Sequence, residues 1–115
     1  MKYPEFPDQG QFTQISDVLS GKCESEISVR GWIYRTRSSG KLAFIVLRDS
    51  TDSIQCTVSK RNVSELSFSD ARKALIESSV VVRGIPTKDD RAPGGWELRA
   101  TNFKVVHFAE TFPIT

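Results

Sequence analysis

The chain has 115 residues, 38% of them hydrophobic and 26% charged, and its formal net charge is +2. This length suits one domain, and this composition excludes an intrinsically disordered chain, so we expect an independently folding unit. The only cysteines, Cys23 and Cys56, lie outside any C-x-x-C pattern, which argues against a zinc site and a disulfide framework. Since no apolar run suits a membrane span or a secretory signal, we expect a cytoplasmic protein without a membrane partner.

The chain begins with a segment rich in proline, glycine and polar residues that leads into one predicted helix. Thr13 can cap this helix and Gly21 can end it. The apolar residues between them recur at helical spacing: Ile15, Val18 and Leu19. We therefore expect residues 1–24 to form an N-terminal extension that contains a short helix.

Three predicted strands follow, because the hydrophobic pattern changes from helical spacing to alternation. Alternation runs from residue 26 to 34 and returns at residues 42–49 and 53–58. The polar residues 35–40 are expected to form a loop, and residues 50–52 a turn. Three strands joined in this way predict an antiparallel meander.

The second half of the chain predicts a connecting helix and two further strands. These elements are expected at residues 71–77, 80–85 and 96–108. Ser69 or Asp70 can cap the helix, and residues 86–95 are expected to form a long loop between the two strands. Apolar residues occupy two alternation registers in the last strand, which predicts a β-bulge near Thr101.

The order β-β-β-α-β-β predicts an all-β domain with one connecting helix. We expect residues 25–109 to form a five-stranded Greek-key OB-fold barrel, a fold that binds oligonucleotides on strands 2 and 3 and in two flanking loops. A small SH3-like barrel is the main alternative. It would not normally need a helix between its third and fourth strands.

Positive charge is concentrated in residues 30–61. This stretch has seven basic residues, Arg30, Arg35, Arg37, Lys41, Arg48, Lys60 and Arg61, against only Asp49 and Asp52. A local basic field on a nearly neutral protein favours an anionic partner at one face, although a solvated strand edge would give the same pattern.

Phe44 and Gln55 stand at positions where strand alternation predicts outward side chains. An outward aromatic ring can stack on a base, and a carboxamide offers the donor and acceptor that match the edge of uracil. Arg35 and Arg37 in the adjoining loop can contact a phosphate or a base carbonyl. Each residue also has a simpler interpretation, because a Phe can cover a barrel edge, a Gln can be solvated, and Trp96 can be either packing or a stacking platform.

Motifs that indicate catalysis are absent from the sequence. There is no glycine-rich phosphate loop before a helix, no G-x-S-x-G and no cluster of His with Cys or a carboxylate. We therefore expect this segment to have no enzymatic activity, no metal site and no cofactor of its own.

A series of short motifs in a fixed order resembles the N-terminal anticodon-binding domain of class IIb aminoacyl-tRNA synthetases. The motifs are VRGWI at 29–33, RTR at 35–37, GK at 40–41, FIVLRD at 44–49, IQ at 54–55, ES at 77–78, VVVRG at 80–84 and APGGWEL at 92–98. Within that group, residues 91–98 and 108–115 look most like asparaginyl-tRNA synthetases of archaeal or eukaryotic type. The aspartyl enzymes are the nearest rival.

The resemblance implies a role for each matching residue. Phe44 aligns with the Phe that stacks on the central uridine of the anticodon, Gln55 with the Gln that bonds it, and Arg37 with the Arg that also binds it. Arg35 matches a basic position that would contact phosphate. Trp96 and Glu97 are candidates for contacts with neighbouring bases.

The resemblance also implies a larger parent protein. Residues 110–115 would begin a hinge to a catalytic domain that uses ATP and Mg²⁺ to activate asparagine and transfer it to tRNA-Asn, in a homodimer. The chain would then be an excised and monomeric tRNA-recognition module. The alternatives are the anticodon-binding domain of an aspartyl-tRNA synthetase, a free-standing OB-fold protein that binds single-stranded nucleic acid, and an assembly module that binds protein.

Overall fold

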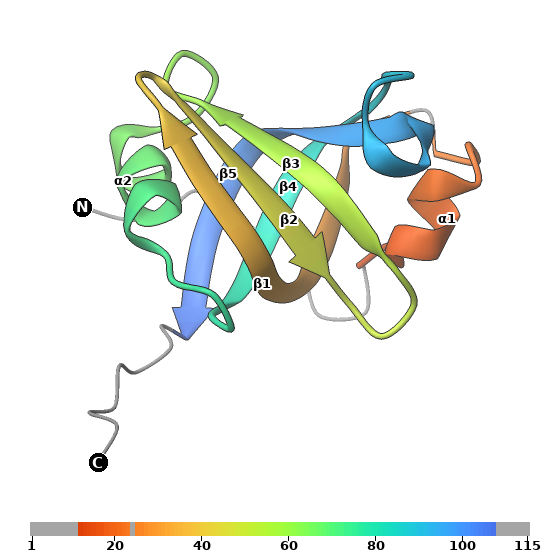
Figure 1. The fold of residues 1–115 in the computed structure, drawn as a ribbon, viewed down its shortest axis with the longest axis horizontal. Coiled ribbons are helices and arrows are strands. Elements are labelled where there is room, and N and C mark those ends of the chain that lie inside the picture. Colours follow the sequence, from red (N-terminus) through yellow and green to blue (C-terminus); the bar gives the residue numbers. More distant parts are fainter. Residues whose placement is uncertain (1–11, 24, 108–115) are drawn as a thin grey trace.

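Five strands rich in β-branched residues curl into a closed barrel in the computed structural model, which describes residues 12–23 and 25–107 (Figure 1). The strands are β1 (Ile27–Ser39), β2 (Leu42–Arg48), β3 (Ser53–Ser59), β4 (Ser79–Lys88) and β5 (Trp96–His107). Their order around the barrel is β1-β2-β3-β5-β4, and only β3 and β5 pair in parallel. The predicted OB-fold barrel is therefore confirmed.

Two helices cover opposite ends of this barrel, and a short 3-10 helix precedes the last strand (Figure 1). They are α1 (Ile15–Leu19), α2 (Glu65–Lys73) and η1 (Pro93–Gly95). Ile15 and Val18 of α1 are fully buried in the same core as the strands. Phe68 and Ala71 of α2 join that core from the other end. No helix in the described part of the chain is long and apolar enough to cross a membrane.

Strand β1 is longer than predicted because it serves two neighbours. Its first half, residues 27–32, pairs with β4, and its second half, residues 32–39, pairs with β2. The predicted loop at residues 35–40 was therefore wrong, since the polar side chains there belong to an exposed strand. The bulge predicted near Thr101 is confirmed, because the register of β4 and β5 shifts between Asn102 and Ala100.

Helix α2 begins six residues earlier than predicted, and neither Ser69 nor Asp70 caps it. Its cap is Ser64, whose Oγ accepts a hydrogen bond from the backbone N–H of Ser67 at 3.1 Å. Two other polar side chains of the helix face the barrel: Ser67 Oγ accepts from Phe103 N–H at 3.2 Å, and Asp70 Oδ2 accepts from a β5 N–H at 3.4 Å. In sequence, an Asp that accepts a hydrogen bond from a strand looks the same as an Asp that caps a helix. This explains why Asp70 was predicted as a cap and the start of α2 was placed too late.

Helix α1 is capped by residues far away in sequence, not by Thr13 as predicted. The backbone N–H of Thr13 donates to Ser28 on β1, and the residue before the helix makes no side-chain cap. Instead, Asp49 Oδ2 accepts a hydrogen bond from the first helical N–H, that of Ile15, at 2.9 Å. Thr51 Oγ1 accepts from Ser16 N–H at 3.1 Å. The turn between β2 and β3 therefore holds the N-terminal helix in place.

Burial alone would raise the pKa of Asp49, but hydrogen bonds from Thr51, Ile15 and Asp52 outweigh it and hold the pKa below its ordinary value. A lowered pKa stabilises the fold above the ordinary value, and this stability is lost as the pH falls through the folded-state pKa. Asp49→Asn is therefore expected to cost about 1 kcal/mol at about pH 7 and less at about pH 3. Urea unfolding at both pH values measures it.

The control for this experiment is Asp90→Asn, because Asp90 is exposed and lies in the loop before β5. That change is expected to leave the free energy of unfolding unaltered at both pH values. An equal cost of Asp49→Asn at both pH values would contradict the role of its ionised carboxylate.

Some predictions fall on residues outside the described part of the chain. The motif at residues 108–115, the hinge at 110–115 and the lead-in up to residue 11 belong to this group. The division into an extension, a barrel and a hinge stays a prediction.

Candidate nucleic-acid interface

The outward faces of β2 and β3 carry the two side chains that strand alternation selected. Ala43 and Ile45 on either side of Phe44 are fully buried, and Phe44 itself is half-buried on the outer face. Gln55 is half-buried between the buried Ile54 and Cys56. The antiparallel register places Gln55 opposite Val46, two residues from Phe44 along β2. The predicted orientation of both residues is therefore confirmed.

A β-bulge in β1 brings the two arginines to this face. Ile33 pairs with Leu47 and Arg35 with Val46, so that Tyr34 is an extra residue in β1. One extra residue reverses the alternation of a strand, and every later side chain changes face. Arg35 and Arg37 consequently lie beside Val46 and Phe44 on strand β1, although the sequence placed them in a loop.

These side chains surround a small cavity. Its volume is about 230 Å³, and its lining consists of Arg35, Thr36, Arg37, Phe44, Val46 and Gln55. The guanidinium carbon of Arg37 lies 4.6 Å from the centre of the Phe44 ring, within the range of a cation–π contact. Four of the six predicted site residues thus meet in one cavity with an aromatic surface, an amide and two cations.

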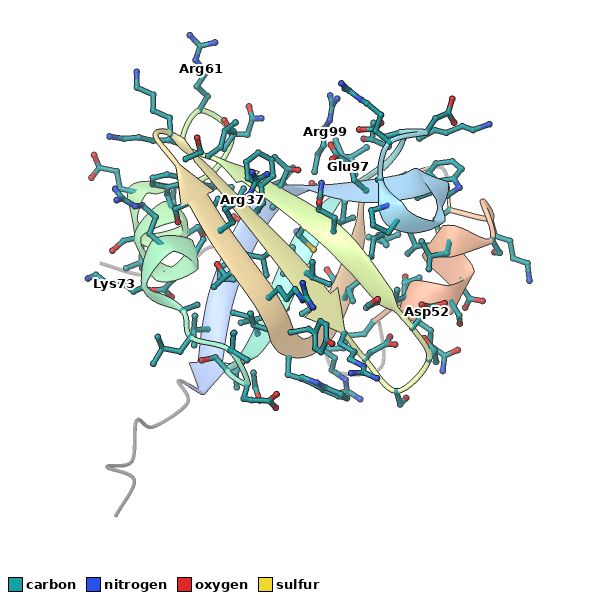
Figure 2. All side chains as sticks on the ribbon, in the orientation of Figure 1. Arg37, Asp52, Arg61, Lys73, Glu97 and Arg99 are labelled. Atoms are coloured by element: carbon teal, nitrogen blue, oxygen red, sulfur yellow. The ribbon has the colours of Figure 1, made fainter. Side chains whose placement is uncertain are left out.

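A second and larger cavity adjoins the first on the side of β5. It measures about 480 Å³, shares Arg37, Phe44 and Gln55 with the first, and is also lined by Thr57, Asp89, Arg91, Ala92, Glu97 and Arg99. Figure 2 shows Arg37, Glu97 and Arg99 over the same part of the barrel, whereas Lys73 and Arg61 lie toward the α2 end. The two cavities share the lining residues Arg37, Phe44 and Gln55 and extend across β1, β2, β3 and β5, and we call them together the base groove.

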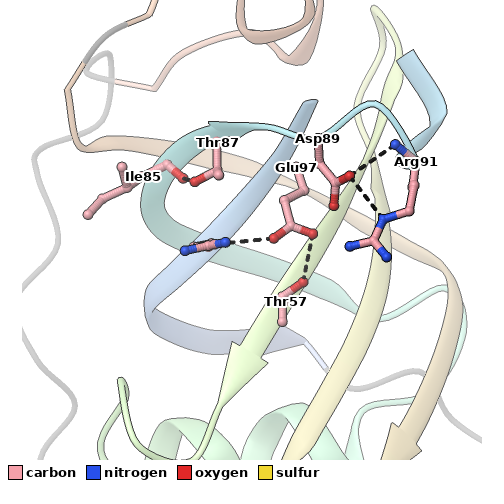
Figure 3. Close-up of polar contacts among 7 residues, drawn as sticks. Thr57, Ile85, Thr87, Asp89, Arg91 and Glu97 are labelled. Carbon is pink, nitrogen blue, oxygen red and sulfur yellow. Dashed lines mark hydrogen bonds and ion pairs between the residues drawn. The ribbon is translucent and has the colours of Figure 1, made fainter. Parts of the chain in front are cut away.

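Glu97 occupies this groove because the parallel pairing of β3 and β5 sets it beside Gln55. It is only 8% exposed, and one carboxylate oxygen accepts a hydrogen bond from Thr57 Oγ1 at 3.2 Å (Figure 3). The other oxygen accepts from Arg99 Nε at 3.4 Å, in a contact that is also an ion pair. The sequence named Glu97 only as a candidate, and the structure places it in the groove.

The charge of Glu97 also reaches the barrel interior. Burial, with the Glu97 carboxylate as a second cause, raises the pKa of the Cys56 thiol to about 12. The thiol therefore stays protonated at neutral pH and acts as a small core side chain, not as a nucleophile.

The structure does not bring Trp96 to the groove. Its indole is half-buried, packs against the core and lies close to Gly21 after α1, and it lines neither cavity. Since neighbouring residues of a strand face opposite sides, Glu97 and Trp96 cannot both face the groove. Of the two interpretations that the sequence left open for Trp96, the structure supports packing.

Sequence reasoning did not name seven residues of the groove as site residues: Thr36, Val46, Thr57, Asp89, Arg91, Ala92 and Arg99. Strand alternation from Gln55 and Glu97 predicts the outward direction of Thr57 and Arg99, so a signal for these two was present. Asp89 and Arg91 lie in the loop before β5, where they form an ion pair at 3.6 Å (Figure 3). No pattern in the sequence indicates how that loop folds back over the groove.

Within residues 12–23 and 25–107, no group of three or more His, Cys, Asp or Glu side chains is arranged to hold a metal ion. The groove therefore offers aromatic stacking, hydrogen bonding and charge. These are the interactions by which proteins bind unstacked nucleobases and the phosphates beside them.

Comparisons with known proteins agree with this geometry. A family model described as an OB-fold nucleic acid binding domain, of the tRNA anti-codon family, matches residues 27–106. An asparagine–tRNA ligase of Pelotomaculum thermopropionicum is 42% identical over 97 residues, which are 84% of this chain and 23% of that protein. The chain thus spans about a quarter of the length of this relative.

Solved structures give the same result. Asparaginyl-tRNA synthetase from Pyrococcus horikoshii, complexed with asparaginyl-adenylate, superposes with a TM-score of 0.82 at 34% identity, over 93% of this chain and 25% of that one. Aspartyl-tRNA synthetase from Entamoeba histolytica, at 21% identity, shares the fold with a TM-score of 0.76 over 98% of this chain and 28% of that one. The resemblance seen in the sequence motifs is confirmed, and the chain belongs to the tRNA anti-codon family of OB-fold nucleic acid binding domains.

Proposed function

We propose that this domain recognises the anticodon loop of a tRNA and prefers the GUU anticodon of tRNA-Asn. The observation that carries the proposal is the meeting of Phe44, Gln55, Arg35 and Arg37 around one cavity of the base groove. The similarity to asparagine–tRNA ligases supports the choice of tRNA. The likeness to an aspartyl enzyme rests on 21% identity and supports the fold alone.

The central uridine would stack on Phe44. In the free protein one face of this ring is covered by the Arg37 guanidinium. An exposed cation–π contact contributes about 0.5 to 1 kcal/mol, whereas a stacked base contributes about 1 to 3 kcal/mol. A base can therefore displace the guanidinium from the ring, which leaves Arg37 free to bond the base or its phosphate.

Arg37 would also decide between uracil and cytosine. The Gln55 carboxamide can match either pyrimidine, because rotation by half a turn exchanges its donor and its acceptor. A guanidinium only donates hydrogen bonds. It can bond the C4 carbonyl of uracil but not the amino group that cytosine carries at C4. Arg37 therefore discriminates between the two bases, which Gln55 alone does not do.

Glu97 would contact the first anticodon base. Its carboxylate lies next to Gln55 in the base groove and accepts hydrogen bonds at both oxygens. Guanine has N–H groups on its Watson–Crick edge that can donate hydrogen bonds to a carboxylate. Adenine has an acceptor at the corresponding ring nitrogen, which a carboxylate cannot bond. A guanine in the first position of the anticodon suits this site.

The activity of the parent protein is part of the same proposal. We assign to it the ATP-dependent ligation of asparagine to tRNA-Asn, with Mg²⁺, in a cytoplasmic homodimer. The chain spans 23% of the length of one asparagine–tRNA ligase that it resembles. The chemistry would take place in the remainder of the parent, and the domain itself would act as a monomeric recognition module.

The experiment that tests the proposal is a fluorescence titration of the domain with anticodon stem-loops at low salt. The loops carry GUU, GCU, GUC or AUU, and a duplex of the stem sequence is the control. We expect GUU to bind most tightly and a change of the central base to weaken binding by about 5- to 150-fold, which corresponds to about 1 to 3 kcal/mol. Preference for GUC would instead indicate an aspartate-type domain, and equal binding of all loops would contradict anticodon recognition.

A further inference from the structure

A second aromatic side chain lies on the outer surface beyond the base groove. Tyr34, the extra residue of the β1 bulge, is 42% exposed. The guanidinium carbon of Arg48 lies 5.2 Å from the centre of its ring, and that of Arg35 lies 5.4 Å from it. Two cations thus accompany one exposed ring, just as Arg37 accompanies Phe44.

Neither Arg35 nor Arg48 takes part in an ion pair within the described residues. The carboxylate that follows Arg48 in sequence is Asp49, and it is engaged by backbone N–H groups of α1 and of its own turn. Two unpaired guanidinium groups beside an aromatic ring attract phosphates and leave a surface on which a base can stack.

Space for a nucleotide is present beside the ring. A cavity of about 430 Å³ lies between Tyr34, Arg48 and the turn at residues 49–53, whose Asp49 and Asp52 also line it. Arg35 contacts the Tyr34 ring and also lines the cavity of Phe44, so it lies between the two aromatic positions. Tyr34 and Phe44 are two to three residues apart along the β1–β2 ladder and lie on neighbouring strands. A rise of about 3.3 Å per residue and a strand spacing of about 4.8 Å place their Cα atoms about 8 to 11 Å apart.

We propose that Tyr34 is a second stacking position for single-stranded RNA. It takes a base that follows or precedes the one stacked on Phe44, while Arg35 binds a phosphate between the two bases and Arg48 binds one on the far side of Tyr34. The separation of about 8 to 11 Å is more than twice the rise of about 3.4 Å per stacked nucleotide, so the strand is extended between the rings. This proposal rests on the proposed function for its choice of RNA as the partner.

The test is an abasic scan of the GUU stem-loop, in which each loop nucleotide in turn lacks its base. Wild type, Tyr34→Ala, Tyr34→Phe and Phe44→Ala are titrated with every RNA. In wild type we expect two sensitive loop positions besides the first anticodon base, each costing at least about fivefold in affinity. One position is expected to lose its sensitivity only in Tyr34→Ala, and the other only in Phe44→Ala. Tyr34→Phe should behave as wild type, because stacking needs the ring and not the hydroxyl.

Ile76→Ala is the matched control, since Ile76 is 52% exposed and lies in the loop after α2. It should change neither affinity nor the abasic pattern. A Tyr34→Ala protein with the wild-type abasic pattern would overturn the second stacking position and leave the proposed function standing. If instead Phe44→Ala changed nothing while Tyr34→Ala removed one sensitive position, the proposed function of Phe44 would fail and the role of Tyr34 would stand.

Discussion

Replacing Phe44 by alanine is expected to weaken binding of the GUU stem-loop by about 5- to 150-fold, the range that corresponds to about 1 to 3 kcal/mol for one stacked base. The ring provides the only aromatic surface among the residues that line the base groove. Its removal also deprives Arg37 of the ring against which its guanidinium rests. Titration of the fluorescent stem-loop at low salt measures the loss.

Two comparisons separate stacking from a general loss of structure. Phe44→Trp retains an aromatic face and should retain most of the affinity. Phe44 is only half-buried, so the alanine variant should still unfold cooperatively in urea. A folded Phe44→Ala protein that binds GUU as tightly as wild type would show that the base is held elsewhere.

Replacing Gly31 by alanine is expected to lower the free energy of unfolding by about 3 kcal/mol, a large part of the about 5 to 15 kcal/mol that stabilises a typical domain. A Cβ atom at Gly31 would lie 2.2 Å from the carbonyl oxygen of Arg48 and 2.9 Å from its carbonyl carbon. These are backbone atoms, which cannot rotate away as a side chain can. Strand β1 would have to move away from β2 at the point where it turns from β4 to β2.

The control for Gly31 is Gly40→Ala in the turn between β1 and β2. A Cβ atom there would meet nothing within 4 Å, and only the positive φ of 59° opposes the change. That conformation costs an alanine about 1 kcal/mol. Urea unfolding of both variants measures the difference, and an equal loss in both would show that the close approach of Arg48 does not explain Gly31.

The sequence predicts those parts of the molecule that local periodicity determines. Alternation in residues 42–49 and 53–58 identifies two strands and the outward direction of Phe44 and Gln55, because a buried face on one side fixes the register. The change of register near Thr101 likewise shows in the apolar residues themselves. Both features depend on neighbours in sequence, so the sequence is sufficient to find them.

Features that depend on distant contacts could not be predicted. The hydrophobic pattern of the sequence does not show the β-bulge at Tyr34. Nothing in residues 35–40 therefore indicates that they continue strand β1. The cap of α1 comes from Asp49, more than thirty residues away. The place of Glu97 beside Gln55 results from the closure of the barrel by β5, which no local pattern encodes.

The parallel ladder that closes the barrel has a consequence for motion. It is the shortest ladder of the barrel, and it consists of Gln55 with Glu97, Cys56 with Leu98 and Thr57 with Arg99. Short ladders open most readily in local unfolding, which hydrogen exchange detects as weak amide protection. An RNA held by Gln55 and Glu97 together would bridge this seam and slow amide exchange along it. Opening of the barrel and release of the RNA would then be a single linked equilibrium.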